Sequence, residues 1–469
     1  MHGLKLENKS HTVLILICDE IAQGYGCDPA SQVTNILHQL TATSMPINKA
    51  DYVYNPVGNR TSLTDRRGAQ AFGYDQLDRL TSASHPLLLD PQAFAYDAVG
   101  NRTTGRTVVN QGNQLTADAN FAYQYDDNGN LTRKTLLATG NYTHYTYDAE
   151  NRLTQVQEFA AGNPTAITTS SYRYDGLGRR IEKVANGQTK RYIYDGEDIL
   201  LEYDGSNVLQ ARYTHGPGID EPIAVTKGAT TFFYHQDGLG SVTDLTDSAG
   251  ATAKSYSYDA YGNILDSPGT VDQPYTYTGR ELDQETGLSY YRARTYDSAV
   301  GRFIQKDPIG LRGGLNVYEY TQSSPTNLSD PLGNCPWCVA GALAGLTDLS
   351  TQLLMNGFRI ECVSWTQVGL SALGGAAGVG IAQKFAQVST VVGGASRPTY
   401  RFFKAKNVGR IESHPIRASA PDWATYPHWH LDGFDGAFRK YHLPLIEPLA
   451  AGVSAAINLS KDDCGCSAQ

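Results

Sequence analysis

The fold is decided by the stretch Tyr96-Asp-Ala-Val-Gly-Asn-Arg-Thr103, because close copies of it recur along the 469-residue chain from Tyr54 onward. The first six copies start 20 residues apart at the shortest (Tyr54 to Tyr74) and 29 at the longest (Tyr96 to Tyr125). Spacing of this kind indicates a repeat architecture in which each copy is one supersecondary unit. The seven copies begin at Tyr54, Tyr74, Tyr96, Tyr125, Tyr147, Tyr174 and Tyr258.

Each copy is predicted to form a β-hairpin. Residues ahead of the tyrosine alternate in type, as in Tyr172-Arg-Tyr174, and this is the period of a strand. The aspartate after the tyrosine is expected to accept hydrogen bonds from turn amides, and the glycine four residues after the tyrosine to take a positive φ. Asp78 and Asn151 stand in this turn in two copies, and their residue types are the next best suited to that conformation. Because one hairpin cannot bury its apolar face alone, stacked hairpins are predicted to form a long coiled sheet.

The repeat resembles the YD repeat of the Rhs and teneurin-like family, over roughly Tyr52 to Gly333. This resemblance implies a mainly β fold, in which β-hairpins spiral into a shell around a cavity that holds the chain's own C-terminal segment. A smaller α/β or α+β C-terminal domain would follow. We expect the shell over 52–274, after an unassigned segment 1–51. Shells of this family are usually longer, so a second chain that completes the shell is an expected partner.

A non-repetitive segment, 275–333, follows the last copy and resembles the Rhs repeat-associated core domain. It contains two Asp-Pro-x-Gly sequences, which begin at Asp307 and Asp330. Paired carboxylates suit peptide hydrolysis when one stays protonated to polarise the scissile carbonyl and the other activates water. A nearby guanidinium can hold one of them ionised and oriented. Asp-Pro-x-Gly is also an ordinary turn sequence, in which Asp caps the turn and Pro fixes φ.

The family resemblance implies a self-cleaving, aspartyl-protease-like core that releases the tail just after the second Asp-Pro-x-Gly. It assigns Asp307 and Asp330 as the carboxylate pair and Arg294 as the supporting arginine. Asn334 stands where the family usually has an apolar leucine. We therefore expect cleavage near Asn334.

The composition of the chain changes at the same place. Of its 30 tyrosines, 27 precede Asn334. The part before Asn334 has 27 basic and 38 acidic side chains, and the tail from Asn334 has 11 basic and 9 acidic ones. Such asymmetry indicates separate domains with different partners. With 41% hydrophobic and 18% charged residues, the chain is of the globular rather than the disordered class.

Two further features concern export and covalent cross-links. The early apolar run Val13–Cys18 is followed at once by Asp19 and is shorter than the roughly 7 to 15 residues that a Sec signal needs. We therefore expect a protein held in the bacterial cytoplasm and then secreted or delivered to a target cell without a Sec signal peptide. No cysteine lies between Cys27 and Cys335, so a disulfide framework cannot hold the repeat region together.

The first part of the tail, 334–397, is rich in Ala and Gly and is predicted to be a helical pre-toxin region. Val363–Ala382 carries no charge and is long enough to span a bilayer, which takes about 20 residues. It is predicted to be either a buried helical hairpin inside a shell or a membrane-inserting element. Cys335-Pro-Trp-Cys338 and Cys464-Gly-Cys466 are either free thiols or a zinc or disulfide clasp.

The last part of the tail, 398–469, is the predicted effector domain. On an extended segment His428, His430 and Asp432 share one face and can offer two imidazoles and a carboxylate to a divalent metal. The same residues, with Lys440 and His442, can instead perform metal-free acid–base cleavage of RNA. The surroundings are basic and would attract a phosphate backbone. The alternative is a half-buried aromatic strand in which the histidines are structural.

Together these features favour an Rhs-family carrier that cleaves itself near Asn334 and releases a toxin, preferably an antibacterial nuclease acting on nucleic acid in a competitor. By family resemblance its partners are a cognate immunity protein and a secretion apparatus with its spike or adaptor protein. Two other readings stay open. One is a membrane-inserting toxin tail, and the other is a non-catalytic YD-repeat shell that binds surfaces.

Overall fold

The computed structural model describes residues 12–16, 21–30, 32–41, 43–216 and 218–334, and in the tail the backbone of four short strands. By internal contacts the chain forms two compact units, Met1–Pro336 and Trp337–Gln469. The described residues of the first unit form strands, turns and short 3-10 helices. The expected mainly β shell is therefore confirmed.

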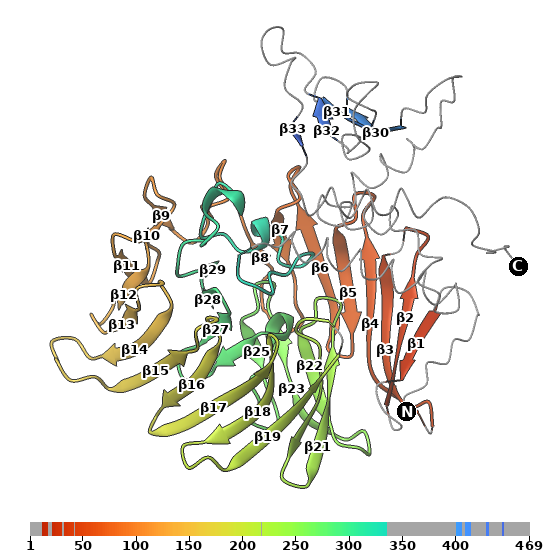
Figure 1. Ribbon diagram of the computed structural model, residues 1–469, viewed down its shortest axis with the longest axis horizontal. Helices are drawn as coiled ribbons and strands as arrows, with labels where there is room; N and C mark the ends of the chain where they lie inside the picture. The colour runs from red at the N-terminus through yellow and green to blue at the C-terminus, as the bar shows by residue number, and fades with distance from the viewer. Residues whose placement is uncertain are drawn as a thin grey trace, which may run out of the picture. The chain divides into compact units, whose positions relative to one another are not determined.

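The first sheet has eight antiparallel strands in sequence order, so each pairs with its neighbours in the chain (Figure 1). It begins ahead of the first repeat copy, and one strand runs across the expected boundary between residues 51 and 52. The strands are β1 (Thr12–Leu16), β2 (Ile21–Cys27), β3 (Val33–Leu40), β4 (Pro46–Tyr54), β5 (Arg60–Asp65), β6 (Gly68–Tyr74), β7 (Leu80–Ala83) and β8 (Gln92–Ala93).

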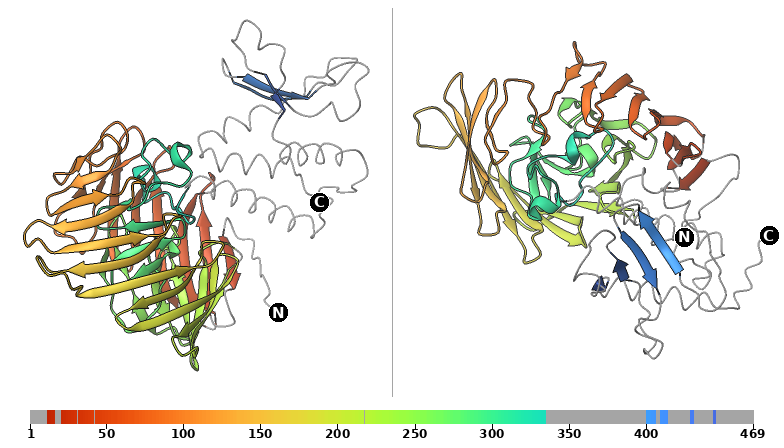
Figure 2. Two further views of the ribbon diagram at one scale, coloured as in Figure 1. Left: turned by 60° about the vertical axis from the view of Figure 1, so that its left-hand side comes forward. Right: turned by 90° about the horizontal axis from the view of Figure 1, so that it is seen from above.

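The second sheet continues the same meander through fifteen strands, again in sequence order, and curves strongly along its length (Figure 2). Its strands are β9 (Val108–Val109), β10 (Leu115–Ala117), β11 (Phe121–Tyr125), β12 (Leu131–Leu136), β13 (Tyr142–Tyr147), β14 (Leu153–Phe159), β15 (Thr168–Tyr174), β16 (Arg180–Ala185), β17 (Gln188–Asp195), β18 (Asp198–Asp204), β19 (Leu209–His215), β20 (Pro222–Lys227), β21 (Thr230–Gln236), β22 (Val242–Thr246) and β23 (Thr252–Ser255).

The aspartate turns form as the repeat predicts. In the turn after Tyr174, Asp175 Oδ1 accepts hydrogen bonds from the amides of Leu177 and Arg179, both at 2.9 Å. Positive φ occurs four residues after the tyrosine in every copy, as at Gly178 with 84°. The non-glycine residues Asp78 and Asn151 take it too, both at 61°.

Six of the seven repeat tyrosines lie at a break in strand register, and the seventh, Tyr96, forms an isolated bridge with Arg102. The pairing shifts at Tyr54, Tyr74, Tyr125, Tyr147, Tyr174 and Tyr258. A β-bulge bends a strand and increases its right-handed twist. A bulge repeated in six of the seven copies should therefore curl the ribbon of strands in one direction, which agrees with the curvature of the sheets.

The beginning of the chain lies against the end of the repeat region. His38 Nε2 is 3.0 Å from the carbonyl oxygen of Gln236, and Asn48 Nδ2 donates to Thr243 Oγ1 at 2.8 Å. These contacts join β3 and β4 to β21 and β22. The spiral has therefore come back beside its first strands, as Figure 1 shows for the two sheets.

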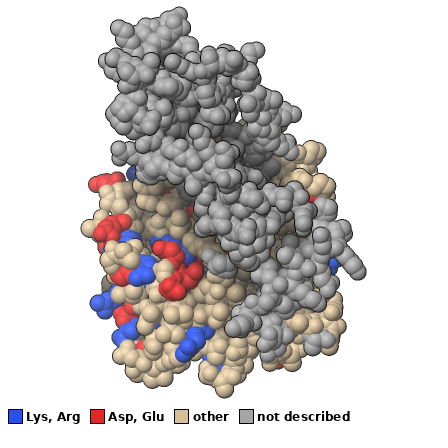
Figure 3. Space-filling view, turned by 45° about the vertical axis from the view of Figure 1, so that its right-hand side comes forward, with Lys and Arg blue, Asp and Glu red and all other residues tan. Residues whose placement is uncertain are grey.

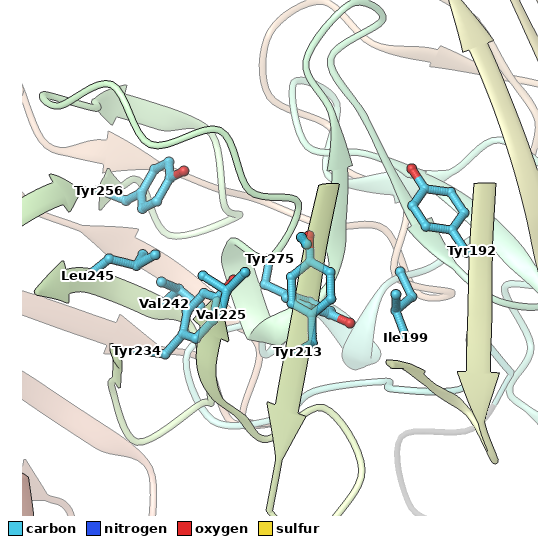
Figure 4. Packing of buried hydrophobic residues seen from close by; sticks show 10 residues of the cluster. Tyr192, Ile199, Tyr213, Val225, Tyr234, Val242, Leu245, Tyr256 and Tyr275 are labelled. Atoms are coloured by element: carbon cyan, nitrogen blue, oxygen red, sulfur yellow. The ribbon is translucent and has the colours of Figure 1, made fainter. Parts of the chain in front are cut away.

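The non-repetitive core segment fills the concave side of the sheets. Tyr275 packs with Tyr213 and Tyr234 from β19 and β21 in a buried cluster (Figure 4). Leu288 and Ile304 pack in a second cluster with residues of β10 to β15. The segment contains β26 (Glu281–Asp283), β27 (Leu288–Tyr291), β28 (Arg294–Asp297) and β29 (Arg302–Phe303), which form a small antiparallel sheet, with 3-10 turns η1 (Tyr277–Gly279), η2 (Gly310–Arg312) and η3 (Thr321–Ser323); the hairpin β24 (Ser257–Tyr258) and β25 (Ile264–Asp266) leads into it.

In the second unit, the backbone of four strands forms one antiparallel sheet in sequence order. These strands are β30 (Tyr400–Ala405), β31 (Gly409–Ser413), β32 (His428–His430) and β33 (Leu443–Pro444). The predicted helical region 334–397 lies outside the described residues from 335 on, and so does Val363–Ala382. Among the residues that the structure describes, no helix is long and apolar enough to cross a membrane.

Candidate self-cleavage site

Arg294 is the central side chain of the site. It begins β28, and its guanidinium is 3.6 Å from the centre of the Phe303 ring. Only 3% of the residue is exposed. A guanidinium presents several N–H donors in one plane and can therefore bind more than one acceptor at a time.

Both predicted aspartates are bound to this guanidinium. Arg294 Nη2 lies 3.2 Å from Asp307 Oδ2 and 3.0 Å from Asp330 Oδ2. The three residues come from β28 and from two turns that follow it in the chain. The structure thus brings together the three residues that the sequence assigns to self-cleavage.

The two carboxylates have different surroundings. Asp307 caps its own turn, because its Oδ1 accepts from the amide of Ile309 at 3.0 Å. Burial raises the pKa of the Asp307 carboxyl; Arg294 opposes this shift, and the charge of Asp330 adds to it. The environment of Asp307 therefore favours the protonated form of its carboxyl group.

Asp330 and Arg294 together hold the peptide group between Gly333 and Asn334. Asp330 Oδ1 accepts a hydrogen bond from the amide of Asn334 at 3.1 Å, and Arg294 Nε donates to the carbonyl oxygen of Gly333. The site residues therefore contact the backbone at the expected cleavage position. The Asp330 contact is of the same type as that between Asp175 and the amide of Arg179 in a repeat turn, and the turn at Asp330 has in addition the contact of Arg294 with the Gly333 carbonyl.

The end of the core segment is fixed by its neighbours. Gly333 has a φ of 69°, and a side chain there would collide with the carbonyl oxygen of Tyr291. The amide of Ala293 donates to the carbonyl of Leu332 at 3.3 Å, and Arg292 donates to the carbonyl of Pro331. The last four residues of the segment thus run along the turn between β27 and β28, directly beside Arg294.

Buried ion pairs fasten the core segment to the shell. Arg180 of β16 donates to Asp283 Oδ2 at 2.6 Å and to Glu281 Oε2 at 2.9 Å. Asp220, in the turn before β20, accepts from both Arg280 and Arg292. Since Arg292 also holds the carbonyl of Pro331, one chain of polar contacts runs from the shell to the cleavage position.

Sequence reasoning did not find these shell contacts. Asp220 and Arg180 lie outside the Tyr-Asp pairs and the Asp-Pro-x-Gly sequences, on which the prediction rests. The density of charged residues over 280–294 is a signal that could have indicated buried pairs. The backbone contacts of Arg294 were also missed, because a sequence pattern carries no information on which carbonyl a side chain reaches.

Only part of the candidate effector residues lies in the described part of the chain. The backbone of His428 and His430 lies in β32, where His428 pairs with Glu412 and His430 with Arg410 of β31. Asp432, Lys440 and His442 lie outside the described residues, as do the cysteines from Cys335 on. Within the described part of the chain, no group of three or more His, Cys, Asp or Glu side chains could hold a metal.

The sequential meander, the Tyr-Asp turns and the enclosed core segment define a YD-repeat shell of the Rhs type. The teneurin YD-shell family model matches residues 57–326, and the chain belongs to this family.

Named relatives are similar over half of this chain or more. The chain is 34% identical to the tRNA3(Ser)-specific nuclease WapA of Bacillus spizizenii, over 57% of this chain and 12% of that protein. It is 32% identical to the double-stranded DNA deaminase toxin A of Burkholderia cenocepacia, over 63% and 22%. It is 29% identical to the toxin protein Tse5 of Pseudomonas aeruginosa, over 50% and 20%. The chain thus spans between 12% and 22% of the length of these relatives. Among solved structures, the crystal structure of TcdB2-TccC3 is similar with a TM-score of 0.48 and 19% identity, over 67% of this chain and 19% of that one.

Proposed function

We propose that this chain is a YD-repeat toxin carrier that hydrolyses its own backbone at Asn334 and thereby releases its C-terminal tail. The observation that carries the proposal is the grip of Arg294 and Asp330 on the Gly333–Asn334 peptide group, with Asp307 bound to the same guanidinium. Two carboxylates and a positioned backbone are the parts that peptide hydrolysis needs.

The bond we expect to break is the one that joins Asn334 to Cys335. The preceding peptide group is anchored at both its N–H and its C=O, which fixes the Asn334 carbonyl in place. Asp307, which burial favours in its protonated form, donates a hydrogen bond to that carbonyl, while the carboxylate of Asp330 takes a proton from water. The water oxygen becomes part of a new carboxylate on Asn334. The C–N bond breaks, and the proton passes to the amine of Cys335.

The test is the fate of the full chain after purification. We expect wild type to separate into two fragments on a denaturing gel, and the Asp307→Asn and Asp330→Asn variants to stay whole. Amino-terminal sequencing of the released tail should read Cys-Pro-Trp. A wild-type chain that stays whole over the pH range 4 to 9 would refute self-cleavage, and a tail that starts at Asn334 would move the site by one bond.

We further propose that the tail acts on nucleic acid, as the names of the nuclease and deaminase relatives suggest for those proteins. His428 and His430 are our candidates for its acid–base or metal-binding residues, with Asp432, Lys440 and His442. A cognate immunity protein and a secretion apparatus complete the proposal. A second shell-completing chain would be a further partner.

Expression of the full chain in a bacterial cytoplasm tests this activity. We expect growth arrest with loss of tRNA or DNA, and relief of both in the double variant His428→Ala/His430→Ala. Loss of nuclease activity with a chelator and its return with a divalent cation would assign the metal-dependent mechanism. Intact nucleic acid together with dye leakage would instead support the membrane-inserting tail, and no toxicity at all the non-catalytic shell.

A further inference from the structure

Gly313 lies at the centre of the proposed site although no sequence motif singled it out. It follows the 3-10 turn η2 and donates its amide to the carbonyl of Gly310 at 3.1 Å. Its φ of −78° and ψ of −19° are ordinary right-handed helical values, which any L residue adopts without strain. The backbone conformation therefore does not explain the glycine.

The space around Gly313 does explain it. A Cβ atom at this position would be 3.1 Å from Asp307 Cγ, closer still to Asp307 Oδ2, and 3.3 Å from the carbonyl oxygen of Asn334. The neighbouring Gly314 is a glycine for the opposite reason. Its φ is 149°, and nothing lies within 4 Å of the place where a Cβ would be. The two glycines thus meet two separate needs, one of space and one of conformation.

The Asp307 carboxylate and the Asn334 carbonyl therefore face each other across the volume that a methyl group on Gly313 would fill. The carboxylate has little freedom to give way. Its Oδ1 accepts from Ile309 at 3.0 Å, and its Oδ2 is 3.2 Å from Arg294 Nη2. Any displacement lengthens at least one of these contacts or moves Asp307 away from Asn334.

We propose that Gly313 is a positioning residue for self-cleavage: its missing side chain lets Asp307 reach both Arg294 and the carbonyl of Asn334. The inference rests on the proposed self-cleavage and adds a residue that contacts neither water nor the reacting bond. It also explains why the first Asp-Pro-x-Gly sequence is followed by the adjacent glycines Gly313 and Gly314.

The first test is the time course of cleavage in the full-length Gly313→Ala chain. We expect the rate to fall about 100-fold, the size of effect that a misplacement of about 1 Å produces, and its pH profile to shift because Asp307 is displaced. Gly176→Ala is the matched control, since nothing lies within 4 Å of a Cβ there and its φ is not positive. It should cleave like wild type.

The second test measures the steric contact itself and does not need cleavage. In the uncut Asp330→Asn chain, we expect Gly313→Ala to lower the melting temperature. In a chain that also carries Asp307→Ala, the same substitution should lower the melting temperature less, because only the 3.3 Å contact with the Asn334 carbonyl oxygen remains. An equal loss in both backgrounds would show that the methyl group does not meet Asp307.

The outcomes separate the two proposals. If wild type cleaves and Gly313→Ala cleaves equally fast with the same pH profile, Gly313 has no positioning role and self-cleavage stands. If wild type never cleaves, self-cleavage fails and the role of Gly313 fails with it, whatever the melting temperatures show about the contact.

Discussion

At the scale of single residues, the repeat tyrosine links one hairpin to the one before it. The hydroxyl of Tyr174 donates to the carbonyl of Leu153 at 2.6 Å, and that of Tyr147 to the carbonyl of Leu131 at 2.8 Å. The ring packs in the core while the hydroxyl satisfies a backbone acceptor. Tyrosine therefore does what phenylalanine cannot, and this accounts for the excess of tyrosine before Asn334.

The tyrosine contact predicts a measurable loss in Tyr174→Phe. The carbonyl of Leu153 would lose its donor, so the free energy of unfolding should fall by about 1 to 2 kcal/mol in urea titrations. Tyr172→Phe is the control, because the buried hydroxyl of Tyr172 forms no hydrogen bond of acceptable geometry among the described residues. It should cost nothing or stabilise the chain slightly, and equal losses in both variants would contradict the explanation.

Glu319 predicts the pH dependence of stability. Its Oε1 accepts from Ser323 at 2.6 Å, and burial raises the pKa of its carboxyl to about 7. The folded state holds the Glu319 proton more tightly than the unfolded state does. The protonated Glu319 therefore contributes its full stabilisation of the fold below about pH 4.5, and this contribution is lost as the pH rises through 7. The loss should be on the order of 3 kcal/mol. Urea unfolding at pH 5 and pH 8 should show this loss of free energy of unfolding in wild type and not in Glu319→Gln. An equal change between the two pH values in both proteins would contradict the prediction.

At the scale of the element, the hairpin was predictable and its bulge was not. The strand period, the turn aspartate and the positive φ at Gly178 all follow from local sequence. The register shift at Tyr174 depends on how two strands pair, and a single hairpin sequence does not specify that. The arginine after the turn was also missed: Arg179 binds Asp175 Oδ2 at 2.8 Å and the carbonyl of Gly196, in the turn between β17 and β18, at 2.9 Å.

The turn after Tyr174 allows a matched pair of substitutions. Gly178→Ala places a Cβ in open space but at a φ of 84°, so it should destabilise the chain by about 1 to 2 kcal/mol. Gly176→Ala, in the same turn, has equally open space without positive φ, and should be neutral or stabilising by a few tenths of a kcal/mol, on the order expected from a less flexible unfolded chain. Thermal melts of the two variants compare them directly. A reversed order would show that φ does not decide the choice of glycine.

At the scale of the molecule, the shell and the core segment are joined both by shared apolar clusters and by buried ion pairs. Charged side chains on the outer surface are interspersed in sign in the view of Figure 3, whereas those at the join of shell and core are buried and paired. The sequence predicted that Arg294, Asp307 and Asp330 belong together, by family resemblance. It did not predict that Arg180 and Asp220 anchor the core segment that carries these three residues. Ion pairs between residues so far apart in the sequence depend on the curvature of the sheet.

The buried join predicts a large effect of Arg180→Met. Glu281 would lose its nearer cation and keep only Arg280 at 4.0 Å, and Asp283 would keep only Lys183. Because both carboxylates would stay buried with fewer ion pairs, we expect a loss of about 3 kcal/mol in the free energy of unfolding. Arg173→Met is the control, because Arg173 is exposed and only touches Glu182 at 3.5 Å. Its effect should stay below about 1 kcal/mol. Similar losses in both would mean that the join does not hold the core segment. Limited proteolysis should also cut the 280–333 segment faster in Arg180→Met.

The sequence-order pairing of all strands in the two sheets has a consequence for timing. Each described strand of the shell finds its partners among residues already synthesised or about to be, so the shell can assemble progressively from its first strand as the chain emerges. Arg294, Asp307 and Asp330 come after every one of those strands. A chain whose synthesis stops early therefore lacks these three residues. Under the proposed self-cleavage, a chain able to cleave itself has already synthesised every described strand of the two sheets.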